Sequence, residues 1–320
     1  MTLLLIATIV AVSNVPQASA RTTRTRTTHE ACTDPLAYQV LLDRHGFSPG
    51  EIDGRRGPNL SGALRAFQKT AGLPETGAPD CDTWTHLSGT AQDESVVEYQ
   101  LTDADLAGPF LQSRLPDRLA DQAALPALGY ESALEALAER FHASPRLLRT
   151  LNPHPRLIAG ATIRVPAVTP FDPAQKPVPD QGAGELIVTV SRSSNTLEVR
   201  RPDGSLVFFA PVSSGSEHDP LPLGSWKVNG TAWQPPFHYN PRLFWDAEST
   251  DTKAVIEPGP NNPVGVVWID INVPHYGLHG TPSPALVGHA QSHGCVRLTN
   301  WDAARLASLV KPGTRVEFVP

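Results

Sequence analysis

Residues 276–298 read Tyr-Gly-Leu-His-Gly-Thr-Pro-Ser-Pro-Ala-Leu-Val-Gly-His-Ala-Gln-Ser-His-Gly-Cys-Val-Arg-Leu, which places His279 sixteen positions before Cys295. A cysteine thiol is a nucleophile only when a base or a positive field keeps part of it as thiolate, so we expect a histidine to act on Cys295. Gly294 lets a substrate carbonyl approach the backbone closely, and the peptide N–H groups around Cys295 are candidate oxyanion donors. If this segment is extended, Arg297 projects from the same face as Cys295. The stretch predicts an acyl-transfer site built on a thiol.

The pattern resembles the catalytic motif of the L,D-transpeptidases, the YkuD family of cell-wall enzymes. That motif is a His, a spacer, then Ser/Thr-His-Gly-Cys and an Arg or Asn two positions after the Cys. Residues 292–297 match it as Ser-His-Gly-Cys-Val-Arg. The segments Tyr-Asn-Pro at 239–241 and Pro-Gly-Pro-Asn-Asn-Pro-Val-Gly at 258–265 also resemble segments of the family. The resemblance spans roughly residues 185–319 and implies a mainly β catalytic domain, a sandwich or barrel, over residues 185–320.

The resemblance implies a role for each central residue of the motif. Cys295 corresponds to the nucleophile, His279 to the general base and acid, and the backbone carbonyl of Gly280 to the group that orients the His279 ring. A histidine that is hydrogen-bonded to a carbonyl through one nitrogen presents the other in a fixed tautomer. His293 is the alternative base. We also expect His279 and the nearby backbone dipoles to favour the thiolate of Cys295.

Further residues are predicted to support the reaction or to bind substrate. Around the cysteine, His293 and Gly294 are expected in the oxyanion turn, and Ser292 and Arg297 are supporting candidates. Tyr239 and Trp268 are candidate contacts in the substrate groove, although packing in the core explains either residue equally well. His275 and His289 are expected on the surface.

The activity that the resemblance implies is acyl transfer on peptidoglycan stem peptides. The thiol would attack the carbonyl between the L-centre of meso-diaminopimelate and the terminal D-alanine, form a thioester and release D-alanine. A stem-peptide amine would then give a 3–3 cross-link, the lysine of a lipoprotein would give attachment of that protein, and water would make the enzyme an L,D-carboxypeptidase. The motif does not choose among these acceptors.

Two alternatives belong to other functional classes. A zinc site would use His279, His293 and Cys295, with His289 one helical turn before His293. The chain has neither a His-Glu-x-x-His run nor a Cys-x-x-Cys pair, so we predict no metal and no cofactor. The other alternative is a non-catalytic cell-wall-binding protein, and the intact motif argues against it.

The 320 residues allow two or three domains, and the net charge of −6 gives no argument for a nucleic-acid partner. Residues 3–12 are apolar but too few to span a bilayer, and Ala-Ser-Ala follows at 18–20. We therefore predict a secretory signal peptide over 1–20, a flexible spacer over 21–33, and an exported protein of the periplasm or cell envelope without a transmembrane anchor. No Lys or Arg precedes the apolar run, so an uncleaved anchor or a start further upstream is the alternative.

Export gives meaning to the three cysteines. Cys32 and Cys81 bracket one predicted unit, and an oxidising compartment favours a disulfide between them over two buried free thiols. Closing a loop of that length stabilises a fold by about 4 kcal/mol on the chain-entropy model. Cys295 is then the odd cysteine, and catalysis explains an unpaired thiol in an exported protein.

The unit predicted over residues 34–89 is a small three-helix domain. Apolar residues at helical spacing predict a first helix that ends near Gly46, Asn59 is the expected N-cap of a second, and Trp84 lies on a short third. The unit resembles the peptidoglycan-binding domain 1 family in three segments: Asp53–Pro58, Ala63–Gln68 and Thr83–Leu87. Phe67 and Trp84 are predicted to pack in its core.

The middle unit, predicted over 96–167, carries two helical patterns, at 133–141 and 145–152, and a closing strand at 162–166. This order is similar to the back half of a LysM domain, a β-α-α-β glycan-binding fold. Tyr99 and its neighbours are the candidate first strand, but some thirty residues separate them from the helices. A helical spacer that only positions its neighbours is the alternative.

Four prolines in polar surroundings predict a linker over 168–184. Short strands separated by Gly and Pro follow, and one helix is expected at about 300–310. The whole chain is therefore predicted to be a multidomain α+β protein with a three-helix first domain, a LysM-like middle domain and a mainly β C-terminal domain.

Overall fold

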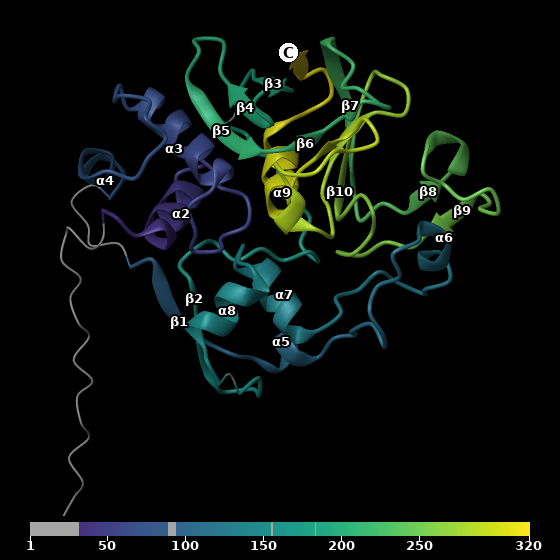
Figure 1. Cartoon of the computed structure of the whole chain (residues 1–320), viewed down its shortest axis with the longest axis horizontal. Helices are drawn as coiled ribbons and strands as arrows, with labels where there is room; N and C mark the ends of the chain where they lie inside the picture. The colour runs from purple at the N-terminus through teal and green to yellow at the C-terminus, as the bar shows by residue number, and fades with distance from the viewer. Residues whose placement is uncertain (1–31, 89–93, 155, 183) are drawn as a thin grey trace, which may run out of the picture.

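The computed structural model describes residues 32–88, 94–154, 156–182 and 184–320. The predicted signal peptide and nearly all of the predicted spacer lie outside the described residues. Within those ranges no helix combines the length and the apolar character needed to cross a membrane. Figure 1 shows the helical first unit, the middle unit and the strand-rich C-terminal domain packed side by side.

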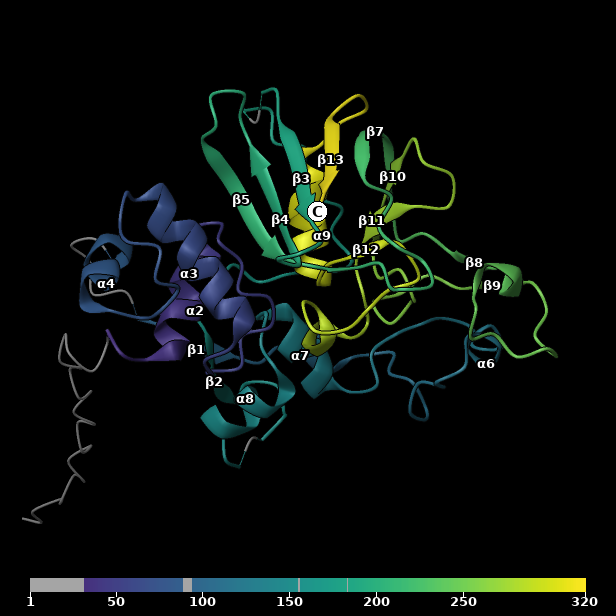
Figure 2. The same ribbon diagram turned by 45° about the horizontal axis from the view of Figure 1, so that its top comes forward.

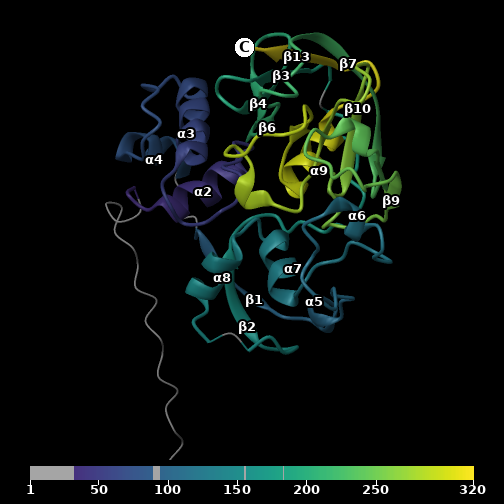
Figure 3. The same ribbon diagram turned by 45° about the vertical axis from the view of Figure 1, so that its right-hand side comes forward.

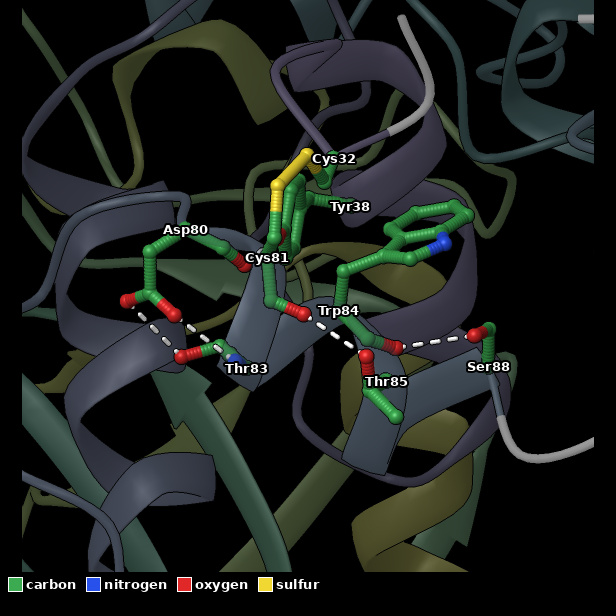
Figure 4. Close-up of a disulfide and its surroundings, with 8 residues drawn as sticks. All are labelled: Cys32, Tyr38, Asp80, Cys81, Thr83, Trp84, Thr85 and Ser88. Carbon is green, nitrogen blue, oxygen red and sulfur yellow. Dashed lines mark hydrogen bonds between the residues drawn. A yellow bond between two sulfur atoms is a disulfide. The ribbon is translucent and has the colours of Figure 1, made fainter. Parts of the chain in front are cut away.

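Three helices form the first unit: α2 (Pro35–Arg44), α3 (Pro58–Thr70) and α4 (Cys81–Ser88). Their apolar faces enclose a core in which the rings of Tyr38 and Trp84 meet edge to face, 5.3 Å apart. Phe67 and Trp84 are each 9% exposed, so their predicted place in the core is confirmed. A disulfide joins Cys32 to Cys81 at the start of α4 (Figure 4).

The predicted capping role of Asn59 is wrong. Helix α3 begins at Pro58, and Gly57 takes the N-cap position without a side-chain hydrogen bond. Proline suits the first helical position because its missing N–H would have no partner there. Asn59 instead donates from Nδ2 to the backbone oxygen of Val287 at 2.9 Å, and so joins the first unit to a loop of the C-terminal domain.

The middle unit contains two antiparallel strands, β1 (Val96–Gln100) and β2 (Thr162–Pro166), and two helices, α7 (Ala133–Arg140) and α8 (Pro145–Leu151). Val96 lies opposite Pro166, so a first strand forms where the sequence left it in doubt. The core beneath the helices takes in Val40 and Ile52 of the first unit. The core of the middle unit therefore includes residues of the first unit.

An arm, defined as residues 107–131, interrupts the middle unit between β1 and α7. It follows the short helix α5 (Asp103–Leu106) and contains α6 (Leu119–Gln122). Figures 1 and 3 show α6 beside the hairpin of β8 (Phe237–Tyr239) and β9 (Ala254–Ile256). The arm thus extends from the middle unit to the C-terminal domain.

The C-terminal domain is built on a nine-stranded sheet of order β5-β4-β3-β13-β7-β10-β11-β12-β6 (Figure 2). The strands are β3 (Ile187–Ser191), β4 (Thr196–Arg200), β5 (Leu206–Pro211), β6 (Ser213–Ser214), β7 (Gly224–Trp233), β10 (Val267–Ile271), β11 (Gly277–His279), β12 (Val296–Arg297) and β13 (Arg315–Val319). Val212 alone separates β5 from β6 in the chain, yet these strands lie at opposite ends of the order. The sheet must therefore curl into a barrel-like shape, and the predicted mainly β fold of this domain is confirmed.

Helix α9 (Asn300–Leu309) packs against this sheet through Trp301 and Leu306, which are buried in the largest core. Two short 3₁₀ helices, η1 (Pro241–Leu243) and η2 (Pro284–Leu286), lie in the loops. The first unit docks on the edge strand β5, where the N–H of Ser48 donates to the backbone oxygen of Phe209 at 2.8 Å. The contact extends the sheet edge with backbone from the first unit.

The segment predicted as a Pro-rich linker makes contacts with the C-terminal domain. Phe171 is 8% exposed and belongs to the core of the C-terminal domain. The N–H of Asp180 donates to the backbone oxygen of Ser308 in α9 at 2.8 Å. The segment therefore runs along the domain that it precedes.

Candidate active site

Strands β11 and β12 bring the motif residues together. They pair in parallel, with Leu278 opposite Val296 and His279 opposite Arg297, so the histidine ends one strand and Cys295 directly precedes the other. Cys295, His279 and Arg297 line a common cavity of about 910 Å³. Other residues that line this cavity are Tyr239, Trp268, Tyr276 and His293.

His279 is held in one orientation by its neighbours. Its Nδ1 lies 2.6 Å from the backbone oxygen of Gly280, which is the contact expected from the sequence, and its ring stacks on that of Trp268 at 5.5 Å. Burial, together with the charge of Arg297, lowers the pKa of His279 to about 3. The imidazole is therefore neutral, with Nδ1–H donating to the carbonyl and Nε2 left as the basic nitrogen.

The thiol of Cys295 is also neutral at rest. Burial raises its pKa to about 11, although a backbone hydrogen bond from Gly277 and the charge of Arg297 act in the opposite direction. The expectation that the surroundings favour the thiolate is therefore wrong, because loss of solvent outweighs the local dipoles. The resting site pairs a neutral thiol with a neutral imidazole, so the thiol proton has to move during the reaction.

Ser292 fixes the turn that carries Cys295. Its Oγ donates to the backbone oxygen of Cys295 at 2.6 Å and accepts from the N–H of Gly215 at 2.7 Å. Gly294 has a φ of 98°, and a Cβ at this position would lie 2.6 Å from a ring carbon of Tyr276. Glycine is required here by both its backbone conformation and the close approach of Tyr276.

His293 has a carboxylate partner of its own. Its Nε2 lies 2.9 Å from Oδ1 of Asp246, and its ring contacts those of Phe244 and Trp245 at 4.8 Å and 5.8 Å. These contacts hold the segment after η1 against the catalytic turn. Each histidine has one engaged ring nitrogen, since Nδ1 of His293 has no partner among the described residues and Nδ1 is the engaged nitrogen of His279. The assignment of His279 as the base therefore continues to rest on the sequence motif.

Arg297 and Tyr239 both line the cavity but differ in their surroundings. Burial lowers the pKa of Arg297, and the nearby Cys295 and Asp246 oppose that effect. Tyr239 is only 3% exposed, and its hydroxyl donates to Oδ2 of Asp251 at 2.8 Å. Tyr239 is therefore both a core residue and part of the cavity wall, the two roles that the sequence left open.

His275 and His289 were the histidines expected on the surface, and His275 also lines the cavity. His275 and His289 are exposed, as expected, and the backbone oxygen of His275 lies 3.5 Å from Sγ of Cys295. Across the ranges that the structure describes, no three His, Cys, Asp or Glu side chains are grouped closely enough to hold a metal ion. The zinc alternative thus has no ligand set among these residues.

The arm supplies cavity residues that sequence reasoning missed. Asp117, Arg118 and Leu119 line the cavity, and Nη2 of Arg118 lies 2.7 Å from Oδ1 of Asp251 and 3.0 Å from Oε2 of Glu248. The ion pairs tie the arm to the loop of the β8–β9 hairpin. No sequence motif marks these residues. The one sequence signal that the arm has a separate role was its length, because it interrupts the middle unit between the first strand and the helices.

Comparisons with known proteins bear on this site. A model of the L,D-transpeptidase catalytic domain matches residues 185–318, and a model described as "Putative peptidoglycan binding domain" matches residues 33–87. The "Putative L,D-transpeptidase YqjB" of Bacillus subtilis (strain 168) is 30% identical over 156 residues, which are 47% of this chain and 78% of that protein. The chain belongs to the L,D-transpeptidase family.

Other members of the L,D-transpeptidase family match shorter parts of the chain. The "Putative L,D-transpeptidase YkuD" of Bacillus licheniformis is 45% identical over 64 residues, which are 20% of this chain and 39% of that protein. The chain therefore spans less than half the length of this relative. A solved L,D-transpeptidase from Mycobacterium smegmatis superposes with a TM-score of 0.34 at 21% identity, over 42% of this chain and 59% of the other, and carries no weight in the assignment.

Proposed function

We propose that this protein is a peptidoglycan L,D-transpeptidase that works through a thioester on Cys295. The observation that carries the proposal is the cavity lined by both the thiol and a neutral histidine whose Nδ1 is fixed by the Gly280 carbonyl. The donor is a tetrapeptide stem. The sulfur attacks the carbonyl that joins the L-centre of meso-diaminopimelate to the terminal D-alanine.

The neutral state of both groups determines how the proton moves. Nε2 of His279 accepts the thiol proton as the C–S bond forms, because a thiol with a pKa of about 11 does not ionise beforehand. The resulting imidazolium then protonates the amine of D-alanine as the C–N bond breaks. The N–H groups of Gly294 and Cys295 are the proposed donors to the oxyanion, on the turn that Ser292 clamps.

An amine resolves the thioester and gives a 3–3 cross-link. The lysine of a lipoprotein would enter by the same chemistry, and water in place of an amine would make the protein an L,D-carboxypeptidase. The unit that matches the peptidoglycan-binding model supports an enzyme that is held on the wall. The pair of β1 and β2 with α7 and α8 supports a LysM-like glycan contact, and the predicted signal peptide supports export to the periplasm or envelope.

Product analysis tests the proposal. The full chain is incubated with purified disaccharide tetrapeptide, with and without a chelator, and the products are separated by mass spectrometry. A cross-linked dimer and free D-alanine in both samples are expected. Tripeptide alone at high acceptor concentration would show a carboxypeptidase, and loss of all activity with chelator would return the zinc alternative.

A further inference from the structure

Helix α9 begins directly after the strand that carries Arg297, and its first turn lies close to the catalytic backbone. Thr299 is the N-cap residue of this helix, and three residues separate it from Cys295. The N–H of Leu298, the residue before the cap, donates to the backbone oxygen of His279 at 2.8 Å. A shift of the first turn of α9 would therefore reach both catalytic residues through a short stretch of backbone.

Ser48 of the first unit contacts this turn directly. Its Oγ donates to Oδ2 of Asp302 at 2.8 Å, and both residues are only 2% exposed. The hydroxyl of Thr299 donates to the same oxygen at 2.7 Å. Burial raises the pKa of Asp302 to about 7, and these two hydroxyls oppose the rise because they stabilise the carboxylate. The helix cap and the first unit therefore meet on one carboxylate oxygen.

A second contact begins at Asp43 of the first unit. Its Oδ2 lies 3.0 Å from Nδ1 of His142, a residue of the middle unit. The ring of His142 stacks on that of Trp301, with centroids 5.0 Å apart and an angle of 5° between the two planes. Trp301 and Asp302 are adjacent in α9, so the first unit holds two successive residues of its first turn, one through His142 and one directly.

We propose that the first unit positions the catalytic residues, in addition to the wall contact already proposed for it. Ser48 acts through Asp302, and Asp43 acts through His142 on Trp301. Both are positioning residues, since neither lines the cavity of Cys295. This rests on the proposed function of Cys295.

A wall anchor and a positioning unit differ in the substrates that they affect. Loss of an anchor slows the reaction only on the insoluble wall, because a small soluble donor needs no anchor. Loss of a positioning contact slows the reaction on every donor, since the reacting groups are then misplaced. Disaccharide tetrapeptide is soluble and therefore separates the two roles.

Three variants of the full chain make the test. Ser48→Ala removes the hydroxyl that donates to Asp302, and Ser48→Thr keeps a hydroxyl at the same place. Ser88→Ala is the matched control, because it removes another serine hydroxyl of the first unit, one that donates to the backbone oxygen of Trp84 at 2.8 Å within that unit.

D-alanine release from disaccharide tetrapeptide gives kcat and KM for each variant. We expect Ser48→Ala to lower kcat about tenfold with KM within about twofold of the wild type, because the reacting groups are misplaced while the cavity is kept. Ser48→Thr and Ser88→Ala should stay within about twofold of the wild type in both constants. In a chain that already carries Asp302→Ala, Ser48→Ala should lower kcat no further, since Ser48 acts through that carboxylate.

Alkylation of Cys295 by iodoacetamide reports on the same contact without any substrate. A looser turn admits solvent to the buried thiol, so Ser48→Ala should raise the alkylation rate at pH 8 about threefold. Ser48→Thr and Ser88→Ala should keep the wild-type rate.

An unchanged kcat in Ser48→Ala would overturn the positioning role, and so would equal losses in Ser48→Ala and Ser48→Thr. If Ser48→Ala does not fold, Asp43→Ala reaches α9 by the other contact and should show the same fall in kcat, and a wild-type value there would overturn the role as well. Absence of D-alanine release by the wild type would instead remove the proposed function. The alkylation rate of Ser48→Ala would then decide the positioning role, which a wild-type rate would contradict.

Discussion

Glu139 of α7 and Asn300, the first residue of α9, are joined by a buried hydrogen bond in which Asn300 Nδ2 lies 2.6 Å from Glu139 Oε1. The same amide accepts at Oδ1 from the N–H of Val266 at 3.1 Å. A Cβ on Gly280 would lie 2.1 Å from that Oδ1, so the amide is packed directly on the backbone that orients His279. The middle unit thus contacts the group that packs on the backbone beside His279.

Glu139→Ala should lower kcat more than it changes KM. The substitution removes the partner of Asn300, and we expect the looser backbone at Gly280 to reduce kcat about tenfold. Glu139→Gln should recover most of kcat, because its amide oxygen still accepts from Asn300. Steady-state D-alanine release measures both constants. Glu98→Ala, an exposed change in the same unit, is the control, and equal effects of Ala and Gln at 139 would contradict a positioning role.

Alkylation of Cys295 should show no plateau near neutral pH. Burial raises the pKa of this thiol to about 11, and only the thiolate reacts, so the rate with iodoacetamide should rise about tenfold per pH unit from pH 6 to 9. Arg297→Ala removes a charge that lowers the pKa and should slow alkylation severalfold at pH 8. A rate that levels off below pH 8 would instead indicate a preformed thiolate–imidazolium pair.

Much of the site could be predicted from sequence because its chemistry is local. Ser292, Gly294 and Cys295 lie within one turn, and the contact of His279 with Gly280 joins neighbours in the chain. The direction of the Cys295 pKa shift could not be predicted, because burial is set by residues from distant segments.

Long-range contacts explain the remaining misses. Arg118 and Asp251 are 133 positions apart, and Glu139 and Asn300 are 161 apart. A single ion pair or hydrogen bond between such positions leaves no periodic pattern in either segment. The same holds for Val40, because helical periodicity marks it as buried but does not show that it packs against the middle unit.

Arg118→Ala should raise KM for the donor about threefold to tenfold with a small change in stability. The Arg118 side chain is 44% exposed in its ion pairs with Glu248 and Asp251, so solvent screening keeps their contribution to the free energy of unfolding small. They do, however, hold the arm to the hairpin loop at the cavity. Arg149→Ala removes an exposed charge of α8 that does not line the cavity, and it is the control. A KM equal to that of the control would show that the ion pairs do not shape the cavity.

Loss of the disulfide should destabilise more than the first unit. The double substitution Cys32→Ser and Cys81→Ser removes a covalent link between residues 49 positions apart in the sequence. It should lower the free energy of unfolding by about 2–4 kcal/mol. Because Val40 and Ile52 of the first unit are buried in the core of the middle unit, we expect a single shifted thermal transition for the two. Calorimetry measures it, and a separate early transition confined to the first unit would argue for independent modules.

The intact mass of the full chain after rapid mixing with disaccharide tetrapeptide tests the central claim most directly. The account predicts a transient adduct with the mass of the donor minus D-alanine, mapped to the peptide that contains Cys295 and absent from Cys295→Ala. The variant should keep the wild-type fold by circular dichroism. Cross-linked dimer formed by Cys295→Ala, or an adduct mapped to another residue, would contradict it.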